Sequence, residues 1–405
     1  MALKETIKMP SRSPRSRVMA WVVEAIEGGA LSHGSPLPAE RTLAEQLMVS
    51  RVTVKAAIAD LIRAGVVGPT DEGRIRRVIG PQEHKTASVL RSTIALLSST
   101  SEPAAGRRES GWLEYMAQGV VLALRAAGRN VLVVHPDQMA TDGLERLLSA
   151  PPLGVVMPEP GDPLPGQDLW LRRLAAAGIP VVVYGDSDDL SDFDRVVSDH
   201  EGATYELTKW VIGQGRRRII NLSGKPGDHY WYLNRLRGHE RAMREAGLES
   251  RPPILFTSVD RLSPGNGGLN AGPWDSFDVA RHQLAGQLAP LVYGSEPVDA
   301  IMLGNDNQVY PTAAALRLLG LEPGRDVLLV GYDNIWADSR ERHFETAIPA
   351  ATVDKCNAEI GQELVRLLMD RVEGRLPQGP QRRVVPSRLI VIEQDQNTSS
   401  LGVNP

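Results

Sequence analysis

The chain has 405 residues, of which 42% are hydrophobic and 23% charged, and its formal net charge is −4 at pH 7. This composition excludes a largely disordered chain, collagen and a coiled coil, and the length predicts two or three domains. No apolar run reaches the ~18 residues of a membrane helix, and the N-terminus lacks the apolar core of a secretory signal. The single cysteine, Cys356, excludes a disulfide framework within the chain. We therefore expect a cytoplasmic protein.

The small net charge hides an asymmetry along the chain. Residues 1–85 contain 13 Lys and Arg against 9 Asp and Glu, whereas residues 86–405 contain 32 against 40. A basic N-terminal part on an acidic body indicates that the N-terminal part meets a polyanion, although many basic segments are only solvated surfaces.

Three short helices are expected in the basic part. Apolar residues recur at helical spacing over 19–26, and Gly28 then ends the helix. A second helix is expected just after Pro38, with Leu43, Ala44 and Leu47 on its apolar face.

The third helix is expected over about 51–63, with Ser50 as its N-cap and with Val54, Ala57, Ile58 and Leu61 buried. Residues 66–79 then read as two strands joined by a turn at 71–73. Three helices followed by a hairpin predict a winged helix-turn-helix domain over residues 14–79.

Such a domain places the first turns of its third helix against base edges and phosphates. Ser50, Arg51, Thr53 and Lys55 occupy those turns, and the hairpin carries further arginines. The alternative is a small helical domain with scattered surface charge.

The pattern LPAER–LAEQL–VSRVTVKAAI–L–AG, within residues 16–78, resembles the head of the GntR family. The resemblance implies DNA contacts by Arg41, Ser50, Arg51, Thr53 and Lys55. It also implies that Gly73 forms the tip of the wing, with Arg74 beside it. The family often has Gly-x-Gly-Thr in the wing, whereas this chain has Glu-Gly-Arg-Ile-Arg-Arg.

Residues 80–92 lack apolar periodicity and are expected to be a linker. From residue 93 to about 397, short buried strands alternate with helical segments. This succession predicts an α/β domain with parallel sheets covered by helices. Because some 300 residues exceed one simple sheet, two lobes are expected.

Several of these strands end in polar residues, among them Asp186, Asn305 and Asp333. Ligands of open α/β sheets bind outside the carboxyl ends of the strands, where carboxylates and amides would bind sugar hydroxyls. Trp112, Trp231 and Trp274 would stack on a sugar ring. The alternatives are helix capping for the carboxylates and ordinary packing for the tryptophans.

The order of the motifs IALLS, GIPVVVYGD, VVSDHEGA, GRRRIINLSG, DAIMLGND, DVLLVGYDN and ATVDKCNAEIG resembles the LacI/GalR fold, which is related to periplasmic binding proteins. The resemblance covers about residues 93–394. It implies effector contacts by Arg235, Asn305 and Asp333, stacking by Trp274, and further contacts by Lys355. Residues 261–272 form an insertion before Trp274, expected to be a surface loop or a lid. The bacterial arabinose repressor has the same pairing of head and body.

We therefore expect a transcriptional regulator, more specifically a repressor, that binds a palindromic operator as a homodimer. A sugar-like effector bound between two lobes would change its DNA affinity. No catalytic residue, metal site or cofactor is expected, since the chain lacks a P-loop, a nucleophile elbow and a His-Glu-x-x-His pair. The alternatives are a cytoplasmic sugar-binding protein and a sugar-modifying α/β enzyme.

Overall fold

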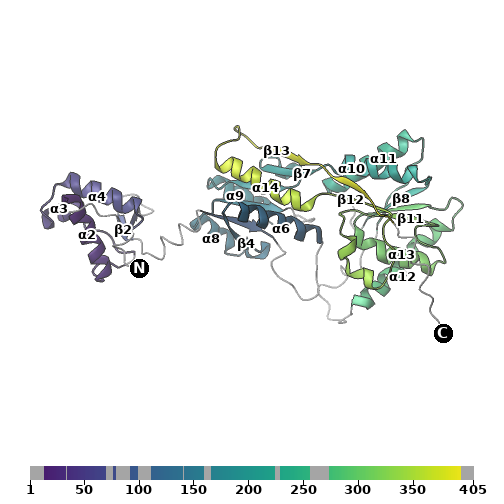
Figure 1. Cartoon of the computed structure of the whole chain (residues 1–405), viewed down its shortest axis with the longest axis horizontal. Helices are drawn as coiled ribbons and strands as arrows, with labels where there is room; N and C mark the ends of the chain where they lie inside the picture. The colour runs from purple at the N-terminus through teal and green to yellow at the C-terminus, as the bar shows by residue number, and fades with distance from the viewer. Residues whose placement is uncertain are drawn as a thin grey trace. The chain divides into compact units, whose positions relative to one another are not determined.

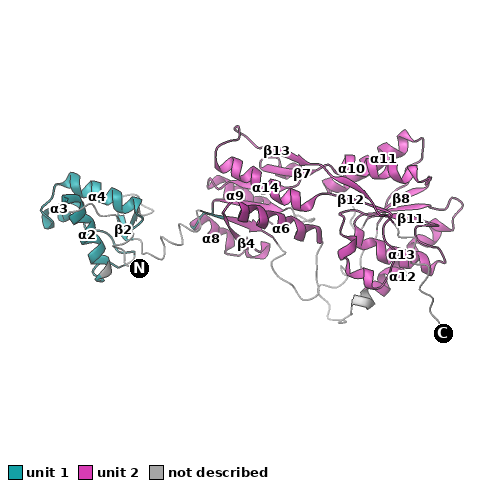
Figure 2. Ribbon diagram, in the orientation of Figure 1, with its two compact units in different colours: residues 1–93, 150–152 teal, residues 94–149, 153–405 magenta. Residues whose placement is uncertain are grey.

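The structure is a computed structural model that describes residues 13–32, 34–69, 76–78, 92–98, 111–139, 141–158, 166–223, 229–255 and 273–393. The chain divides into two compact units (Figure 2). The first comprises Met1–Thr93 with Ala150–Pro152, and the second comprises Ile94–Ser149 with Leu153–Pro405. Each unit is described by itself below. In the described part of the chain, no helix has both the length and the hydropathy needed to cross a membrane.

In its described residues, the first unit contains three helices and two paired strands (Figure 1). The helices are α2 (Pro14–Glu27), α3 (Glu40–Gln46) and α4 (Arg51–Arg63). The strands β1 (Val67–Pro69) and β2 (Arg76–Val78) pair antiparallel with Val67 opposite Val78. This arrangement confirms the predicted winged helix-turn-helix fold, while the expected turn at 71–73 lies outside the described residues.

One apolar core joins the three helices of this unit. Val22, Leu43, Val54, Ile58 and Leu61 are all buried in it. Serine side chains cap two of the helices: the Ser13 hydroxyl accepts from the backbone N–H of Ser16, and the Ser50 hydroxyl accepts from that of Thr53, each at 3.1 Å. The predicted cap at Ser50 and the predicted buried face of α4 are therefore confirmed.

The second unit contains two six-stranded sheets, which confirms the prediction of two lobes. We call the lobe with strand order β13-β7-β6-β5-β3-β4 the N-lobe. Its strands are β3 (Thr93–Leu97), β4 (Asn130–Val134), β5 (Gly154–Pro158), β6 (Val181–Tyr184), β7 (Asp194–Ser198) and β13 (Arg382–Val385). Its helices are α6 (Gly111–Ala126), α7 (Pro136–Met139), α8 (Gly143–Ser149), α9 (Gln167–Ala176) and α14 (Asn357–Val372).

The C-lobe has the strand order β14-β12-β11-β10-β8-β9. Its strands are β8 (Ile219–Ser223), β9 (Ile254–Leu255), β10 (Ala300–Leu303), β11 (Leu328–Val330), β12 (Ala351–Asp354) and β14 (Arg388–Val391). Its α-helices are α10 (His200–Gly213), α11 (Tyr230–Glu245), α12 (Pro273–Val292) and α13 (Val309–Leu318). Strand β12 pairs with β14 antiparallel, and the pairs β3–β5, β5–β6, β6–β7, β7–β13, β8–β9, β8–β10, β10–β11 and β11–β12 are parallel.

Helices cover both faces of each sheet. Successive side chains of a strand point to opposite faces, so each strand contributes to two apolar cores. In β3, Ile94 and Leu96 pack with α6 and α14, whereas Ala95 and Leu97 pack with residues of α8 and α9. The strands of the C-lobe divide in the same way between a core with α12 and α13 and a core with α10 and α11. The parallel strands are therefore apolar almost throughout, as their sequences predict.

The chain passes between the lobes three times. It leaves β7 of the N-lobe for α10, returns from β12 of the C-lobe to α14, and passes from β13 to β14. The first crossing places His200 at the start of α10, and the second places Lys355 just before α14. Both side chains therefore lie at the boundary of the two sheets.

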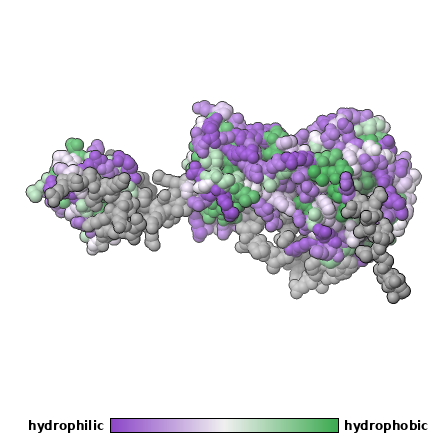
Figure 3. All heavy atoms as spheres, in the orientation of Figure 1, coloured by the Kyte–Doolittle hydropathy of each residue, from purple (hydrophilic) through white to green (hydrophobic). Residues whose placement is uncertain are grey.

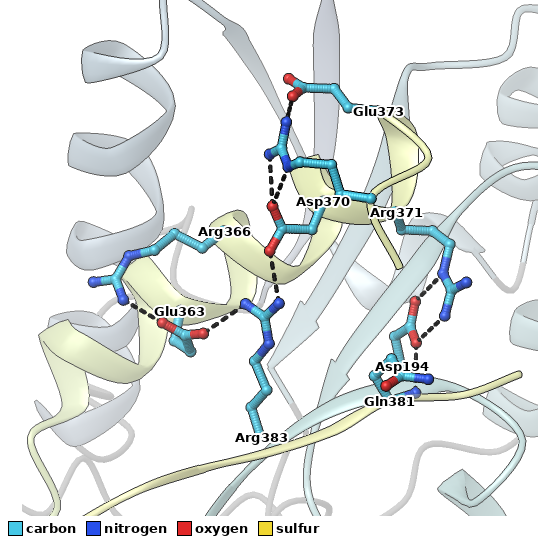
Figure 4. Close-up of polar contacts among 9 residues, drawn as sticks. Asp194, Glu363, Arg366, Asp370, Arg371, Glu373, Gln381 and Arg383 are labelled. Carbon is cyan, nitrogen blue, oxygen red and sulfur yellow. Dashed lines mark hydrogen bonds and ion pairs between the residues drawn. The ribbon is translucent and has the colours of Figure 1, made fainter. Parts of the chain in front are cut away.

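Charged side chains fasten the third crossing to the N-lobe (Figure 4). The carboxylate of Asp194, in β7, accepts from Arg371 of α14 at 2.6 and 2.7 Å and from the backbone N–H of Gln381 at 2.7 Å. Arg383 of β13 donates to Glu363 at 2.8 Å and to Asp370 at 2.6 Å. Strand β13 is thus held by ion pairs, which explains why its sequence has no apolar strand pattern.

Two glycines allow α6 and α14 to pack backbone against backbone. A Cβ added to Gly119 would lie 2.1 Å from the carbonyl oxygen of Ala358, and one added to Gly361 would lie 2.1 Å from that of Met116. Since both neighbours are backbone atoms, neither can move aside without shifting a helix. The pair of helices is therefore fixed at its closest possible approach.

A prediction follows from this contact. Gly119→Ala and Gly361→Ala should each lower the free energy of unfolding by about 1–3 kcal/mol, because overpacking displaces a helix. Gly286→Ala in α12 is the matched control, because its added Cβ meets nothing within 4 Å. That control should be neutral or stabilising by up to about 1 kcal/mol. Chemical denaturation measures all three, and equal values for the three variants would contradict the close contact.

Helix α10 begins at His200, and Asp199 caps it by accepting from the Gly202 N–H at 2.8 Å. Strands β13 (RRVV) and β14 (RLIV) were not expected: each is four residues long and lies at a sheet edge, and β13 opens with two arginines. The linker interior and the insertion at 261–272 lie outside the described residues.

Candidate functional sites

The first turns of α4 present polar and apolar side chains to solvent. Arg51 and Lys55 are exposed, and Val52 is 79% exposed, whereas Val54 points into the core. Thr53 is half-buried, and its hydroxyl lies 2.8 Å from that of Ser50. The capping bonds thus engage Ser50 and Thr53, while Arg51 and Lys55 are left extended from the helix.

Arg41 and two arginines of the paired strands also have partners within this unit. The Arg41 side chain is 78% exposed and lies 3.5 Å from Glu45 on the same helix. In β2, Arg76 lies 3.3 Å from Glu40, and Arg77 donates to the carbonyl of Gly34 at 3.0 Å. Gly73 and Arg74 lie outside the described residues, so their predicted contacts stay predictions.

Sequence reasoning missed Met48, in the turn between α3 and α4. Its side chain is 85% exposed, and its backbone has φ 49°, in the left-handed region. Exposed Met48 and Val52 flank the start of α4, where apolar side chains would contact the methyl groups of thymine. The sequence did offer a signal for Met48: it is a large apolar residue two positions before Ser50, the expected N-cap of α4.

Aromatic and charged side chains gather where the two lobes meet. We call this group the interlobe cluster. It comprises Trp112, Tyr184 and His200 on the N-lobe side and first crossing, Arg235, Tyr332 and Asp333 from the C-lobe, and Lys355 from the second crossing. Of the predicted effector contacts, Trp112, Arg235, Asp333 and Lys355 are brought together here.

A buried ion pair lies in the interlobe cluster. The Lys355 Nζ atom is 2.9 Å from Asp333 Oδ1, and both side chains are 5% exposed. The same ammonium lies 4.1 Å from the centre of the Trp112 ring, a cation–π distance. Burial lowers the pKa of Lys355, while the Asp333 charge works in the opposite direction. The pair therefore joins the two lobes through charge that has little access to water.

Arg235 stacks on an aromatic residue. Its guanidinium carbon lies 3.4 Å from the centre of the Tyr332 ring and 5.0 Å from that of Trp231. Its Nη1 donates to the carbonyl of Gly304 at 2.8 Å, directly before the predicted contact Asn305. Asn305 caps a short 3-10 helix by accepting from the Gln308 N–H at 3.3 Å. The plane of the guanidinium is thus fixed.

The other side of the cluster is aromatic and hydroxylated. The Tyr184 hydroxyl lies 2.9 Å from the Ser198 hydroxyl, and the His200 Nδ1 atom lies 3.4 Å from the Tyr332 hydroxyl. Burial holds the pKa of His200 well below its usual value, and the nearby Arg235 and Lys355 charges act in the same direction. His200 is therefore neutral at pH 7. Tyr184 ends β6, and His200 and Tyr332 each lie two residues after a buried strand, β7 and β11, yet none of the three was expected as an effector contact.

Asp306 supports the cluster from the C-lobe interior. Its carboxylate accepts from the Thr352 hydroxyl at 2.8 Å and from the backbone N–H groups of Ile335 and Trp336 at 2.7 and 3.2 Å. Burial raises its pKa to about 7, although these hydrogen bonds oppose the rise. Asp306 thus ties the segment after Asp333 to the end of β10. Among the residues that the structure describes, no three His, Cys, Asp or Glu side chains are placed to hold a metal ion.

Asp186 has other partners. Its carboxylate accepts from Arg195 at 3.1 Å and from Arg382 at 2.7 Å. Burial works to raise the pKa of Asp186, but the hydrogen bonds from Arg382 and Arg195 outweigh it and hold the pKa below its usual value. In this structure Asp186 joins β7 to β13, so its effector contact stays a prediction. Trp274 lies in the first turn of α12, and its side chain lies outside the described part.

The buried ion pair gives a prediction for stability. Asp333→Asn leaves the Lys355 ammonium buried without its counter-charge and should lower the free energy of unfolding by about 3 kcal/mol at pH 7. The double variant Asp333→Asn/Lys355→Met removes both charges and should recover most of this loss. Glu206→Gln, which breaks an exposed pair with Lys209, is the control and should change the value by less than about 0.5 kcal/mol. If Asp333→Asn matches that control in urea denaturation, the pair does not stabilise the fold.

Comparison with protein families divides the chain as the fold does. Residues 14–75 match the family model described as "Bacterial regulatory proteins, gntR family". Residues 209–392 match the model described as "Periplasmic binding protein-like domain".

Similar proteins are named as regulators. The HTH-type transcriptional regulator CelR of Thermobifida fusca is 29% identical over 234 residues, which are 57% of this chain and 59% of CelR. The HTH-type transcriptional repressor PurR of Vibrio atlanticus is 23% identical over 199 residues, 49% of this chain and 52% of PurR. The chain thus spans a little over half the length of these curated relatives.

Solved structures share the fold. A regulatory protein of the LacI family from Chloroflexus aggregans is 25% identical, with a TM-score of 0.58 over 75% of this chain and 98% of its own. A CelR–cellobiose complex is 21% identical, with a TM-score of 0.57 over 88% of this chain and 99% of its own. The first unit thus matches the GntR model, and the second is a two-lobed α/β unit that matches the periplasmic-binding-protein-like model and is similar to the LacI-family regulatory protein. Both expected resemblances are confirmed.

Proposed function

We propose that this protein is a transcriptional regulator whose affinity for DNA depends on a sugar-like effector bound in the interlobe cluster. The observation that carries the proposal is the exposed start of α4, where Arg51, Val52 and Lys55 face solvent in a GntR-type domain. A helix with this exposure enters the major groove with its N-terminal residues against base edges. The proposal requires no catalytic step.

Arg51 and Lys55 of α4 would have different roles in DNA binding. Arg51 fits a bidentate bond to guanine, and Lys55 fits a phosphate. The positive end of the α4 dipole adds attraction for a phosphate near Ser50. Arg41, exposed on α3, extends the basic surface toward the DNA backbone.

Two copies of the chain would associate through the edges of the sheets. Edge strand β4 exposes Leu132 and Val133, each at 39%, and edge strand β9 exposes Leu255 at 44%. On the face shown in Figure 3, the second unit is mostly hydrophilic, with separate hydrophobic areas. Apolar edge strands are normally covered by a partner. A homodimer would cover them and present two winged helices to a palindromic operator.

The interlobe cluster has the chemistry of a sugar site. Aromatic rings stack on sugar faces, while Asp333, Lys355 and Arg235 offer acceptor and donor groups for hydroxyls. CelR has been solved with cellobiose, and a LacI-family regulator from Enterococcus faecium has been solved with bound ribose. An effector between the lobes would change DNA affinity through its unequal affinity for two states of the dimer.

Repression is the favoured sense of regulation, in line with the named repressors among the relatives. A regulator of this kind works in the compartment that holds the DNA, which in a bacterium is the cytoplasm.

The DNA interface gives a direct test. Arg51→Ala should lower specific operator affinity by about 5- to 150-fold, because a bidentate base contact contributes about 1–3 kcal/mol. Arg63→Ala, at the other end of α4, is the matched control, since Arg63 pairs with Asp60 at 2.9 Å within the same helix. Binding to genomic fragments is measured by mobility shift at fixed salt. Equal affinities for the two variants would contradict the assignment of α4.

The effector site has a separate test. A thermal-shift screen of sugars and sugar phosphates should reveal a compound that raises the melting temperature of the whole chain, because binding stabilises the native state. Asp333→Ala and Arg235→Ala should abolish that shift and the compound's effect on DNA binding, while Glu145→Ala, which breaks an exposed ion pair between α8 and α9, retains both. An undiminished shift in the first two variants would remove the interlobe cluster from the binding site.

A further inference from the structure

A small cavity lies beside Arg235 inside the C-lobe. Its volume is about 30 Å³, and its walls include Thr204 of α10, Asn221 of β8, Tyr332 and apolar residues such as Leu207 and Met302. A cavity needs about 10–15 Å³ to hold a water molecule, so this one has room for one or two.

Three polar atoms on these walls are buried without a hydrogen-bond partner: Thr204 Oγ1, Asn221 Nδ2 and Arg235 Nε. Thr204 is 3% exposed. Burial raises the Tyr332 pKa to about 12, and the Arg235 guanidinium and the Thr204 hydroxyl, both beside Tyr332, offset part of that rise. Neither Arg235 Nε nor Thr204 Oγ1 is aligned with Tyr332 as a hydrogen bond. A buried donor without an acceptor carries a free-energy penalty, so three around one cavity indicate a missing common partner.

Water fits the donor set. Asn221 Nδ2 and Arg235 Nε are obligate donors, and a threonine hydroxyl accepts or donates. A water oxygen would accept from the two nitrogens and donate to Thr204, which satisfies all three atoms at once. A cation is excluded, because two of the three atoms are N–H donors and the Arg235 guanidinium is positive.

We propose that this cavity holds an ordered water molecule bonded to Thr204, Asn221 and Arg235. Thr204 and Asn221 are then positioning residues for the guanidinium. Tyr332 fixes its plane at 3.4 Å, the Gly304 carbonyl fixes Nη1 at 2.8 Å, and the water fixes Nε. The consequence for effector binding rests on the proposed function, whereas the presence of the water does not.

A crystal structure of the whole chain without added sugar tests the site directly. We expect an ordered water within hydrogen-bonding distance of all three atoms. A dry cavity with the three atoms still unpaired would overturn the proposal, and so would side chains turned to bond one another.

Stability measurements provide a second test that needs no effector. Thr204→Val and Asn221→Leu should each lower the melting temperature by about 2 °C or more, because each removes one bond of the water. The double variant should lose less than the sum, because either change already disrupts the water. If the cavity is dry, these variants should leave the melting temperature unchanged or raise it, since replacing an unpaired polar group by an apolar one of similar shape is neutral or stabilising.

The chain offers a matched control for this comparison of two single variants with the double variant. Thr312 of α13 is also fully buried with an unpartnered hydroxyl, but it does not line the cavity. Thr312→Val and Asn221→Leu should therefore be additive in the same melting experiment. Additive behaviour of Thr204→Val with Asn221→Leu, equal to that of the control pair, would overturn the proposal.

Discussion

Three passages of one chain between two parallel sheets set the positions of everything at the lobe boundary. Particular side chains lie at or near each crossing. His200 begins α10, Lys355 precedes α14, and Asp194 holds the start of β13 to the N-lobe. Each crossing leaves from the carboxyl end of a strand, β7, β12 or β13, so the residues at these strand ends lie at the lobe boundary. The interlobe cluster is therefore a product of topology, and its residues come from segments far apart in the sequence.

Much of this fold was accessible from the sequence. Apolar runs identified most of the strands, because parallel strands are buried on both faces, and Ser50 identified the start of α4 through its capping chemistry. Strand β13 (RRVV) escaped because its arginines, which pair with acidic partners, carry no apolar pattern, and β14 (RLIV) escaped because it is only four residues long at a sheet edge. The partners of Arg383, Glu363 and Asp370, lie 20 and 13 residues away on another element, which local patterns cannot relate.

Some residues of the candidate sites were likewise identified from the sequence, and others were not. Arg235, Asp333 and Lys355 were identified by motif, and the structure brings them together. Asp186 has the same strand-end position, yet two arginines occupy its carboxylate, one of them 196 residues later in the chain. Tyr184 and Tyr332 were overlooked, since an aromatic residue at the end of an apolar strand reads as core. What the sequence cannot supply is which polar groups already have partners.

The close packing at Gly119 and Gly361 has a mechanical consequence. Trp112 lies in the first turn of α6, and Lys355 lies between β12 of the C-lobe and α14 of the N-lobe. Because a relative shift of α6 and α14 would bring backbone atoms into collision, these two helices are expected to move as one body. Arg235 and Tyr332 belong to the opposite lobe. The Lys355 side chain contacts both the Trp112 ring of the N-lobe and the Asp333 carboxylate of the C-lobe, so a change in the angle between the lobes would have to alter one of these two contacts.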